Sequence, residues 1–448
     1  MTLPAKNLNT DNKCAAQLRL NVVIVGCGIG GLAAAYCLGR AGHKITVLER
    51  ASEITEIGAG IQVGPNCSRL LIRWGLGDKL EKVAVKPTAV ALLRYGTGEK
   101  VGAMSWENVE EDFGAPYYHV HRADLLGMLH GIAAPYMSVR MNAKVVSVDP
   151  ETTQVKLENG DTVSADLIIG ADGIKSVVRE VVVESPSDNP TTSAPIHTGD
   201  SAYRSVIQTA AMLTDPELRG IVERREMSSW MGPGKHIIGY CIRGGTEYNL
   251  VLVHPDKTSK EGYTIEGSVD QMRKDYEDWE PRIQKILQLV EKTYLLPLMY
   301  REPLDTWVHP SGKVTLLGDA CHATLPSAAQ GSAMAIEDAA VLGSLLTHVT
   351  HHTQLHKLLR AYQTIRHGRT KETQCAAFAN HHIFHLPDGP AQQARDDNLR
   401  ASMMASEKNG SGAAKWNANS WADRKKLETQ FNYDAEAEAE RWLVENDF

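Results

Sequence analysis

The feature that most constrains the fold is a glycine-rich turn near the start of the chain. The turn has the spacing G-x-G-x-x-G, with glycines at Gly26, Gly28 and Gly31. Apolar residues 22–25 precede it and predict a short strand, and residues 32–41 predict a helix. A second apolar strand, over 44–48, ends at Glu49. This order predicts a β-α-β unit and therefore a parallel sheet.

Each glycine of the turn has a physical reason to be there. Gly26 allows the tight turn, Gly28 lets the backbone approach a pyrophosphate, and Gly31 lets the helix pack closely on the strand. The helix N-terminus faces the phosphates. Glu49 can accept both hydroxyls of an adenosine ribose. The unit predicts a dinucleotide site, and by itself it leaves NAD and FAD open.

A second strand-loop-helix segment lies about 290 residues further along the chain. An apolar run over 314–317 leads to Gly318 and Asp319, a small-residue loop follows, and then an Ala-rich helix. Open α/β sheets bind ligands in the crevice beyond the carboxyl ends of their strands. Asp319 is therefore a candidate ligand-binding residue, although Asp is also favoured as an ordinary helix N-cap.

Composition narrows the class of protein. The net charge of −7 disfavours a nucleic-acid partner. The seven cysteines are scattered without a C-x-x-C pair, so a reducing compartment is expected. The first eighteen residues are polar and mixed and do not resemble a signal peptide. We expect a cytoplasmic protein, a monomer or homodimer, with no membrane partner.

The chain is long enough for two or three domains. A segment rich in Pro, Ser, Thr and Asn near residues 185–201 predicts a crossover into a second domain whose strands alternate between faces. The predicted order is two parts of a first domain, a second domain inserted between them and a helical tail, with boundaries 20–184, 185–305, 306–375 and 376–448.

Further motifs give a family resemblance. The residues that carry it are Gly58-Ala59-Gly60-Ile61-Gln62, His121-Arg122-Ala123-Asp124-Leu125, Tyr203-Arg204, and Trp230-Met231-Gly232-Pro233-Gly234 with Tyr240. Together with the glycine turn, Asp172 and Asp319, they resemble the group A FAD-dependent aromatic monooxygenases, which have the para-hydroxybenzoate hydroxylase fold. Within that group the chain looks like the salicylate hydroxylase branch, over roughly 20–375.

The resemblance implies an α/β fold, in which a Rossmann-like FAD-binding domain carries an inserted, mostly antiparallel substrate sheet and C-terminal helices. It also implies FAD as cofactor, NADH or NADPH as co-substrate, and cofactor roles for several residues. Glu49 then binds the adenosine ribose, and Ala59 and Gly60 run beside the ribityl chain. Arg122 contacts the cofactor, and Asp172 supports both FAD and the reduced nicotinamide.

The same resemblance assigns the second segment to the flavin. Asp319 binds the ribityl hydroxyls, Pro326 and Gly331 lie beside the isoalloxazine ring, and the N–H groups at Gly331 and Ser332 face the flavin N1–C2=O edge. A helix N-terminus there stabilises the negative charge of reduced flavin. Read without the resemblance, Arg122 is an ordinary surface residue that opens a helix.

The family uses reduced flavin and O2 to form a C4a-hydroperoxide, which attacks an electron-rich ring. Arg204 and Tyr240 are the candidate catalytic residues. Arg204 can hold a carboxylate or phenolate, and Tyr240 can donate to it or relay its proton. A surface ion pair and a tyrosine packed in the sheet are the ordinary alternatives.

Three functions stay open at this point. The first is hydroxylation of a phenolic aromatic acid in aromatic-compound catabolism, with or without oxidative decarboxylation, of the salicylate or 4-hydroxybenzoate/protocatechuate type. The second is hydroxylation or epoxidation of a polyketide, indole or terpenoid in a biosynthetic pathway. The third is a FAD-fold protein that only binds a partner, as prenyl-protein escort proteins do.

No metal site is predicted from the sequence. Four histidines have helical spacings, namely His348, His351, His352 and His356. Few acids and no cysteine lie near them, so we interpret them as a solvated helix face. His322, three residues after Asp319, is expected to be structural and near the flavin.

Overall fold

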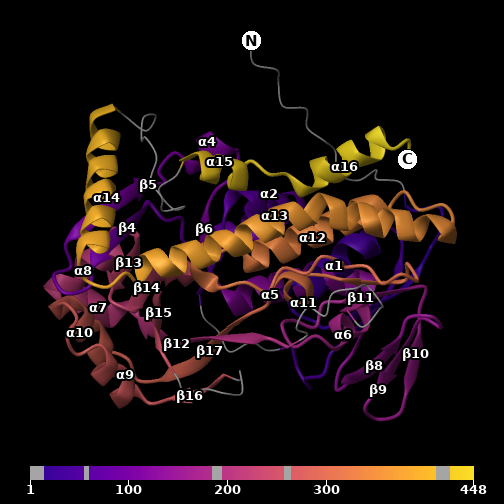
Figure 1. Ribbon diagram of the computed structural model, residues 1–448, viewed down its shortest axis with the longest axis horizontal. Helices are drawn as coiled ribbons and strands as arrows, with labels where there is room; N and C mark the ends of the chain where they lie inside the picture. The colour runs from indigo at the N-terminus through magenta and orange to yellow at the C-terminus, as the bar shows by residue number, and fades with distance from the viewer. Residues whose placement is uncertain (1–14, 55–59, 184–193, 257–263, 410–423) are drawn as a thin grey trace.

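The computed structural model describes residues 15–54, 60–183, 194–256, 264–409 and 424–448 (Figure 1). The first of its two main sheets is parallel, with strand order β18-β11-β1-β2-β7. Its strands are β1 (Asn21–Val25), β2 (Lys44–Leu48), β7 (Met137–Arg140), β11 (Leu167–Gly170) and β18 (Val314–Leu316). Central strands of parallel sheets are buried on both faces, which explains the continuous apolar runs in the sequence.

The parallel order brings distant segments to one edge. β1 pairs with both β2 and β11, and β11 pairs with β18, all in parallel. The glycine turn, Glu49 and Asp319 follow the carboxyl ends of β1, β2 and β18. Glu49 and Asp319, which are 270 positions apart in the chain, therefore lie at the same edge of the sheet. Ligands bind at this edge in open α/β sheets.

Helices cover this sheet and connect its strands. α1 (Ile29–Arg40) packs against α5 (Arg122–Ala133) and α12 (Gly331–Leu346). The approach of α1 to α12 is close, because a Cβ on Gly343 would lie 2.6 Å from the Cβ of Cys37. The shorter helices and turns here are α2 (Pro65–Arg73), α3 (Gly77–Val83), α4 (Val109–Phe113), α6 (Val177–Val183), α11 (Asp319–His322), η1 (Ala134–Tyr136), η3 (Pro326–Ala328) and η4 (His352–Gln354).

Two small sheets complete this part of the molecule. A three-stranded antiparallel sheet contains β8 (Val145–Asp149), β9 (Gln154–Leu157) and β10 (Thr162–Ser164), and β8 packs against α6. The second small sheet pairs β3 (Gly60–Val63) with β6 (Tyr118–His121). β6 also contacts the large sheet through β14, so this pair of strands lies between the two main sheets.

The large sheet has eight strands in the order β16-β17-β12-β15-β14-β13-β4-β5. Among the strands that the structure describes in this sheet, only the β13–β4 pair is parallel. The strands are β4 (Ala89–Arg94), β5 (Lys100–Ser105), β12 (Ile196–Gln208), β13 (Met227–Gly232), β14 (Lys235–Ile242), β15 (Glu247–Pro255), β16 (Ile265–Gly267) and β17 (Thr293–Tyr300), with η2 (Arg243–Gly245) linking β14 to β15.

One face of the large sheet is covered by short helices: α7 (Thr209–Thr214), α8 (Pro216–Glu223), α9 (Val269–Asp275) and α10 (Pro281–Gln288). Large apolar side chains such as Trp230, Tyr248 and Leu252 fill this layer. The other face is turned towards the first domain, where Ala202, Val253 and Ala377 share an apolar cluster.

Long helices follow the returning strand β18. α13 (Leu355–Phe384) runs across the molecule from the first domain to the large sheet (Figure 1). The remaining helices are α14 (Pro390–Asn409), α15 (Arg424–Phe431) and α16 (Ala435–Glu445). No helix within the described segments combines the length and the apolar character needed to cross a lipid bilayer.

The hairpin β4–β5 lies within residues 20–184, which the sequence assigned to the first domain, yet its strands belong to the large sheet. The four boundaries given above therefore remain a prediction about domains rather than about sheets. The partner strand β13 lies more than 120 residues away in the chain, so no local pattern indicates this pairing.

Candidate active site

The glycine turn forms a tight joint between a strand, a helix and a loop. Gly26 has φ +102°, and a Cβ on it would lie 2.4 Å from the Ala171 carbonyl oxygen. A Cβ on Gly31 would lie 2.0 Å from the Gly26 carbonyl oxygen, so only glycine allows this helix-strand approach. Gly28 differs, because a Cβ there would meet no atom within 4 Å.

The start of α1 therefore has the properties of a phosphate site. Gly28 is its N-cap and makes no side-chain cap hydrogen bond to the first N–H groups of the helix. The space beside Gly28 is open, and the first N–H groups of the helix carry the positive end of its dipole. This arrangement fits the pyrophosphate of a dinucleotide, because its oxygens can accept hydrogen bonds from these N–H groups.

Glu49 is held in place beside this turn. Its Oε2 accepts a hydrogen bond from the Cys27 N–H at 2.8 Å, and its Oε1 accepts one from the Ala51 N–H at 2.9 Å. A carboxylate can accept about four hydrogen bonds, so both oxygens keep room for ribose hydroxyls. The geometry is compatible with the predicted ribose role.

Asp319 is not the N-cap that its position suggested. The cap of α11 is Gly318, with φ +64°, and Asp319 is the first helical residue. Its side chain is accessible to solvent, yet protein surrounds it so closely that desolvation raises the pKa of its carboxyl. The positive charges of His322 and Arg122 oppose that rise in pKa. The structure thus brings Arg122 and Asp319 near each other.

Asp172 has a clear structural role. Its Oδ2 accepts hydrogen bonds from the N–H groups of Val177 at 2.8 Å and Val178 at 3.3 Å, at the start of α6. Burial raises the pKa of Asp172, while these hydrogen bonds lower it. The predicted contact of Asp172 with FAD and nicotinamide stays a prediction. Ala59 lies outside the described residues.

The start of α12 is a second uncapped helix end. Gln330 is its N-cap without a side-chain cap, Pro326 is exposed, and Gly331 and Ser332 are half-buried. Ala329 just before it has φ +51°, which turns the chain sharply into the helix. Accessible N–H groups at the end of a buried helix of 16 residues suit an anionic ring edge.

A buried charge network supports this second helix end. Arg366 donates to Glu337 at 2.7 Å and to Asp338 at 2.8 Å, and these three side chains have no exposed area. Asp338 also accepts from the N–H of Gly318 at 3.0 Å and from His322 Nε2 at 2.6 Å. His322 is therefore structural, next to Asp319, as its position suggested.

The network extends to the cap of α12. Asn66 Nδ2 donates to Gln330 Oε1 at 2.9 Å and to Glu337 Oε1 at 2.7 Å. Arg369 forms a bidentate pair with Glu337, with contacts of 2.8 and 2.9 Å. These residues were not predicted from the sequence, although two adjacent acids within an otherwise apolar helix were a usable signal.

The two candidate catalytic residues lie on one face of the large sheet. Arg204 on β12 is paired with Val251, which is paired in turn with Ile238 on β14, and Tyr240 is two residues beyond Ile238. Side chains alternate between faces along a strand, so Arg204 and Tyr240 project to the same side. The strand spacings place their Cα atoms on the order of 12 Å apart.

This face contains a row that protein does not cover completely. Arg204, Val251 and Ile238 are neighbours on three central strands, and all three side chains are half-buried. Their chain neighbours on the opposite face, such as Tyr203 and Ile237, are fully packed. Apolar side chains in the middle of a sheet that stay partly accessible mark space for a ligand.

Tyr240 lies between this row and the predicted cofactor residues. A Cβ on Gly60 would come within 2.8 Å of the Tyr240 hydroxyl, and the Gly60 N–H donates to Asn249 Oδ1 at 2.6 Å. Burial raises the pKa of Tyr240 well above its usual value, while the charge of Arg204 and a hydrogen bond with Gln62 lower it.

Aromatic and polar residues from the small sheet complete the surroundings of Tyr240. The His119 ring lies 4.3 Å from the Tyr240 ring, and the Tyr117 hydroxyl donates to Gln62 Oε1 at 2.7 Å. Burial lowers the pKa of His119 to about 3, so its ring is neutral at physiological pH. Nothing in the sequence pattern distinguished Tyr117 and His119 from core residues.

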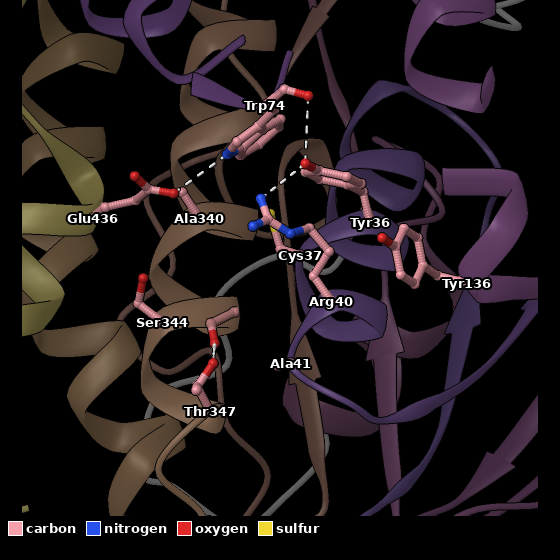
Figure 2. Close-up of a pocket in the computed structure, with 11 residues that line it drawn as sticks. Tyr36, Cys37, Arg40, Ala41, Trp74, Tyr136, Ala340, Ser344, Thr347 and Glu436 are labelled. Atoms are coloured by element: carbon pink, nitrogen blue, oxygen red, sulfur yellow. Dashed lines mark hydrogen bonds between the residues drawn. The ribbon is translucent and has the colours of Figure 1, made fainter. Parts of the chain in front are cut away.

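A pocket of about 230 Å³ lies elsewhere, between the C-terminal half of α1, α12 and α16. Figure 2 shows Arg40 turned towards the Tyr36 hydroxyl, and the Trp74 indole donating to Glu436. The N-terminal end of α1 lies about 10 Å along the helix axis from Tyr36, the nearest α1 residue of this pocket. None of the predicted site residues lines this pocket.

Comparison with known proteins identifies the family. A family model described as "FAD binding domain" matches residues 19–237 and 306–377, a span that includes both uncapped helix ends. The chain belongs to this FAD-binding family. The FAD-dependent monooxygenase OpS4 of Beauveria bassiana is 36% identical over 393 residues, which is 87% of this chain and 91% of that protein.

Two further comparisons agree. A 3-hydroxybenzoate 6-hydroxylase of Klebsiella oxytoca is 31% identical, over 84% of this chain and 91% of that protein. The solved structure of a salicylate hydroxylase substrate complex superposes with a TM-score of 0.75 at 23% identity, covering 94% of this chain and 97% of that one. The predicted fold class and family resemblance are confirmed.

The protein is therefore a FAD-dependent monooxygenase of the aromatic hydroxylase type, with NAD(P)H as the electron donor typical of the family. The residues present fit FAD, because two uncapped helix ends and three carboxylates follow the carboxyl edge of the parallel sheet. Bound FAD supplies the reaction with O2 and the transfer of one oxygen atom to the substrate.

Proposed function

We propose that this monooxygenase hydroxylates a phenolic aromatic acid, with NADH or NADPH and O2 as co-substrates. One oxygen atom enters the ring, the other leaves as water, and the nicotinamide supplies two electrons. The observation that carries the proposal is the half-buried row formed by Arg204, Val251 and Ile238. It combines an apolar surface for a ring with one cation for an acid group.

Each residue around the half-buried row has a separate role in this proposal. Arg204 pairs with the carboxylate or phenolate and fixes the ring over Val251 and Ile238. Tyr240 is the positioning and proton-relay residue, because its hydroxyl lies between the row and Gly60 and is linked to Gln62. The apolar neighbours exclude water, so that the transferred oxygen reaches the ring rather than solvent. The cofactor contacts proposed are those of the glycine turn, Glu49, Gly60, Arg122, Asp172, Asp319, Pro326, Gly331 and Ser332.

Attack at the carboxyl-bearing carbon would release CO2, and attack elsewhere would retain it. Which of these occurs depends on how the ring is oriented between Arg204 and the flavin. Mass analysis of the product separates the two: one outcome adds one oxygen, and the other also loses CO2. Both outcomes support a phenolic acid substrate.

The test is NAD(P)H oxidation by the purified flavoprotein with matched pairs of phenols that have or lack a carboxylate. We expect only the acids to accelerate oxidation and to yield hydroxylated product. Arg204→Gln should raise KM for the acids by about 10- to 150-fold, the equivalent of one ionic hydrogen bond of ~1.5–3 kcal/mol. The matched control is Arg219→Gln, an exposed arginine on α8 behind the sheet.

Equal turnover of both members of each pair, with no effect of Arg204→Gln, would contradict the acid substrate. Turnover confined to larger polyketide, indole or terpenoid substrates would instead support the biosynthetic alternative, with the same fold and cofactor.

A further inference from the structure

Three histidines converge where the large sheet meets the end of α13. His236 lies on β14, His381 lies in the last turn of α13, and His385 is the C-cap of that helix. One ring nitrogen from each lies within 4.8 Å of the others. His236 Nδ1 and His385 Nε2 are 2.7 Å apart. The spacing i, i+4 places His381 and His385 on one helix face.

One carboxylate is hydrogen-bonded to one of these rings and lies near a second. His381 Nε2 lies 2.7 Å from Asp200 Oδ2, and His385 Nδ1 lies 3.9 Å from the same oxygen. Metal-binding histidines almost always donate their second ring N–H to a carboxylate or carbonyl, which fixes the ring and its tautomer. Asp200 on β12 is in the position of such an acceptor.

One further ring nitrogen of this cluster is left for a ligand. With Asp200 on His381 Nε2, the free nitrogen of that ring is Nδ1, which is buried and has no hydrogen-bond partner among the described residues. We propose that His236, His381 and His385 bind a Zn²⁺ ion, with Asp200 as the acceptor that orients His381. Zn–N bonds of about 2.0–2.1 Å in tetrahedral geometry need nitrogens about 3.3 Å apart. The His236–His385 pair, at 2.7 Å, reaches that separation by opening about 0.6 Å.

The surroundings allow an ion to enter. The side chains of His381, His385 and Asp200 are 16%, 11% and 14% exposed. Three protein ligands leave a fourth position for water.

A second group of potential ligands, Cys321, His322 and Asp338, differs in this respect. It has almost no exposed area, and Asp338 is already bonded to Arg366 and Gly318. A cation there would have to displace a buried guanidinium.

A zinc ion at this place would connect three elements. His236 shares the sheet face of Ile238, two residues or about 6.6 Å along β14 from the half-buried row. The ion would hold β14, and through Asp200 also β12, against the end of α13. It would act as a structural clamp between the sheet and the helix, close to the row but outside it.

The test measures zinc in the FAD-loaded enzyme prepared without a histidine tag. The enzyme is stripped with a chelator and reloaded with ZnCl2, and its affinity is measured by competition with a chromophoric chelator. We expect one Zn²⁺ per chain. His385→Gln should weaken binding at least 10-fold, and so should Asp200→Asn, which keeps the shape of the acceptor.

The matched control is His382→Gln, because His382 is exposed in the same helical turn. It should bind zinc like the wild type. Flavin absorbance shows that each variant is folded, and Asp200→Asn provides a second reading if His385→Gln loses its flavin. Zinc content that is substoichiometric in the wild type, or equal in His385→Gln and His382→Gln, would overturn the proposal.

Discussion

The substitution Gly28→Ala should weaken FAD binding without destabilising the apoprotein. The position has φ −77° and ψ −173°, ordinary extended backbone that alanine adopts without strain. A Cβ there meets no protein atom within 4 Å. The apoprotein of Gly28→Ala should therefore be as stable as wild type, or more stable by about 0.4–1 kcal/mol, because alanine restricts the unfolded chain.

The added methyl group lies in the space in front of the uncapped start of α1. We expect it to keep the pyrophosphate from at least one N–H group there. Losing one hydrogen bond to a charged acceptor costs about 1.5–3 kcal/mol. FAD affinity should therefore fall by about 10- to 150-fold.

The contrasting variant is Gly31→Ala. Its Cβ would lie 2.0 Å from the Gly26 carbonyl oxygen, so the helix must move by about 1 Å or more. Such overpacking costs about 1–3 kcal/mol even without cofactor. FAD dissociation constants from fluorescence quenching and thermal unfolding of the deflavinated proteins distinguish the variants. Wild-type FAD affinity in Gly28→Ala would refute the placement of the pyrophosphate, and a destabilised Gly28→Ala apoprotein would refute the packing argument.

Three further predictions follow from the buried groups. Arg366→Met should lower the free energy of unfolding in urea by about 3–5 kcal/mol, because Glu337 and Asp338 then stay buried without their guanidinium; an unchanged midpoint contradicts this. The pKa of Asp338 is lowered to about 2, since His322 and Arg366 outweigh the effect of burial. Ionised Asp338 therefore stabilises the fold above about pH 4, and this stabilisation is lost as the pH falls towards 2. In Asp338→Asn, the decrease of the free energy of unfolding over this pH range should be smaller by about 2 kcal/mol. Tyr240→Phe should keep flavin absorbance but lower the ratio of product to NAD(P)H consumed; an unchanged ratio excludes a role in the reaction.

Local patterns predicted the first domain well. Apolar runs bounded by Gly26, Glu49 and Asp319 mark the ends of parallel strands, because such strands are buried on both faces and their functional residues follow their carboxyl ends. This relation does not depend on which strand pairs with which. The sequence therefore predicted that these residues follow the carboxyl ends of the strands, without knowledge of the strand order.

The substrate side depends on pairing between distant strands, which no local pattern contains. Alternation places Arg204 relative to Val206, and Tyr240 relative to Ile238, but only the register between β12, β15 and β14 puts Arg204 and Tyr240 on one face. His119 reaches Tyr240 from another sheet, and His236 meets His385 across 149 residues. Such contacts arise from tertiary packing, which local sequence patterns do not predict.

Residues near the end of the chain pack against the first domain and accept hydrogen bonds from two of its arginines. Arg369, which neutralises buried Glu337, also donates to the carbonyls of Thr429 at 3.4 Å and Gln430 at 2.9 Å, and Arg69 donates to those of Phe431 and Tyr433. The family match ends at residue 377, so these acceptors lie beyond the shared domain. A chain cut back to the shared domain would open this ion pair to water. For protein engineering, the unit to keep intact therefore extends beyond the shared domain, at least through Tyr433.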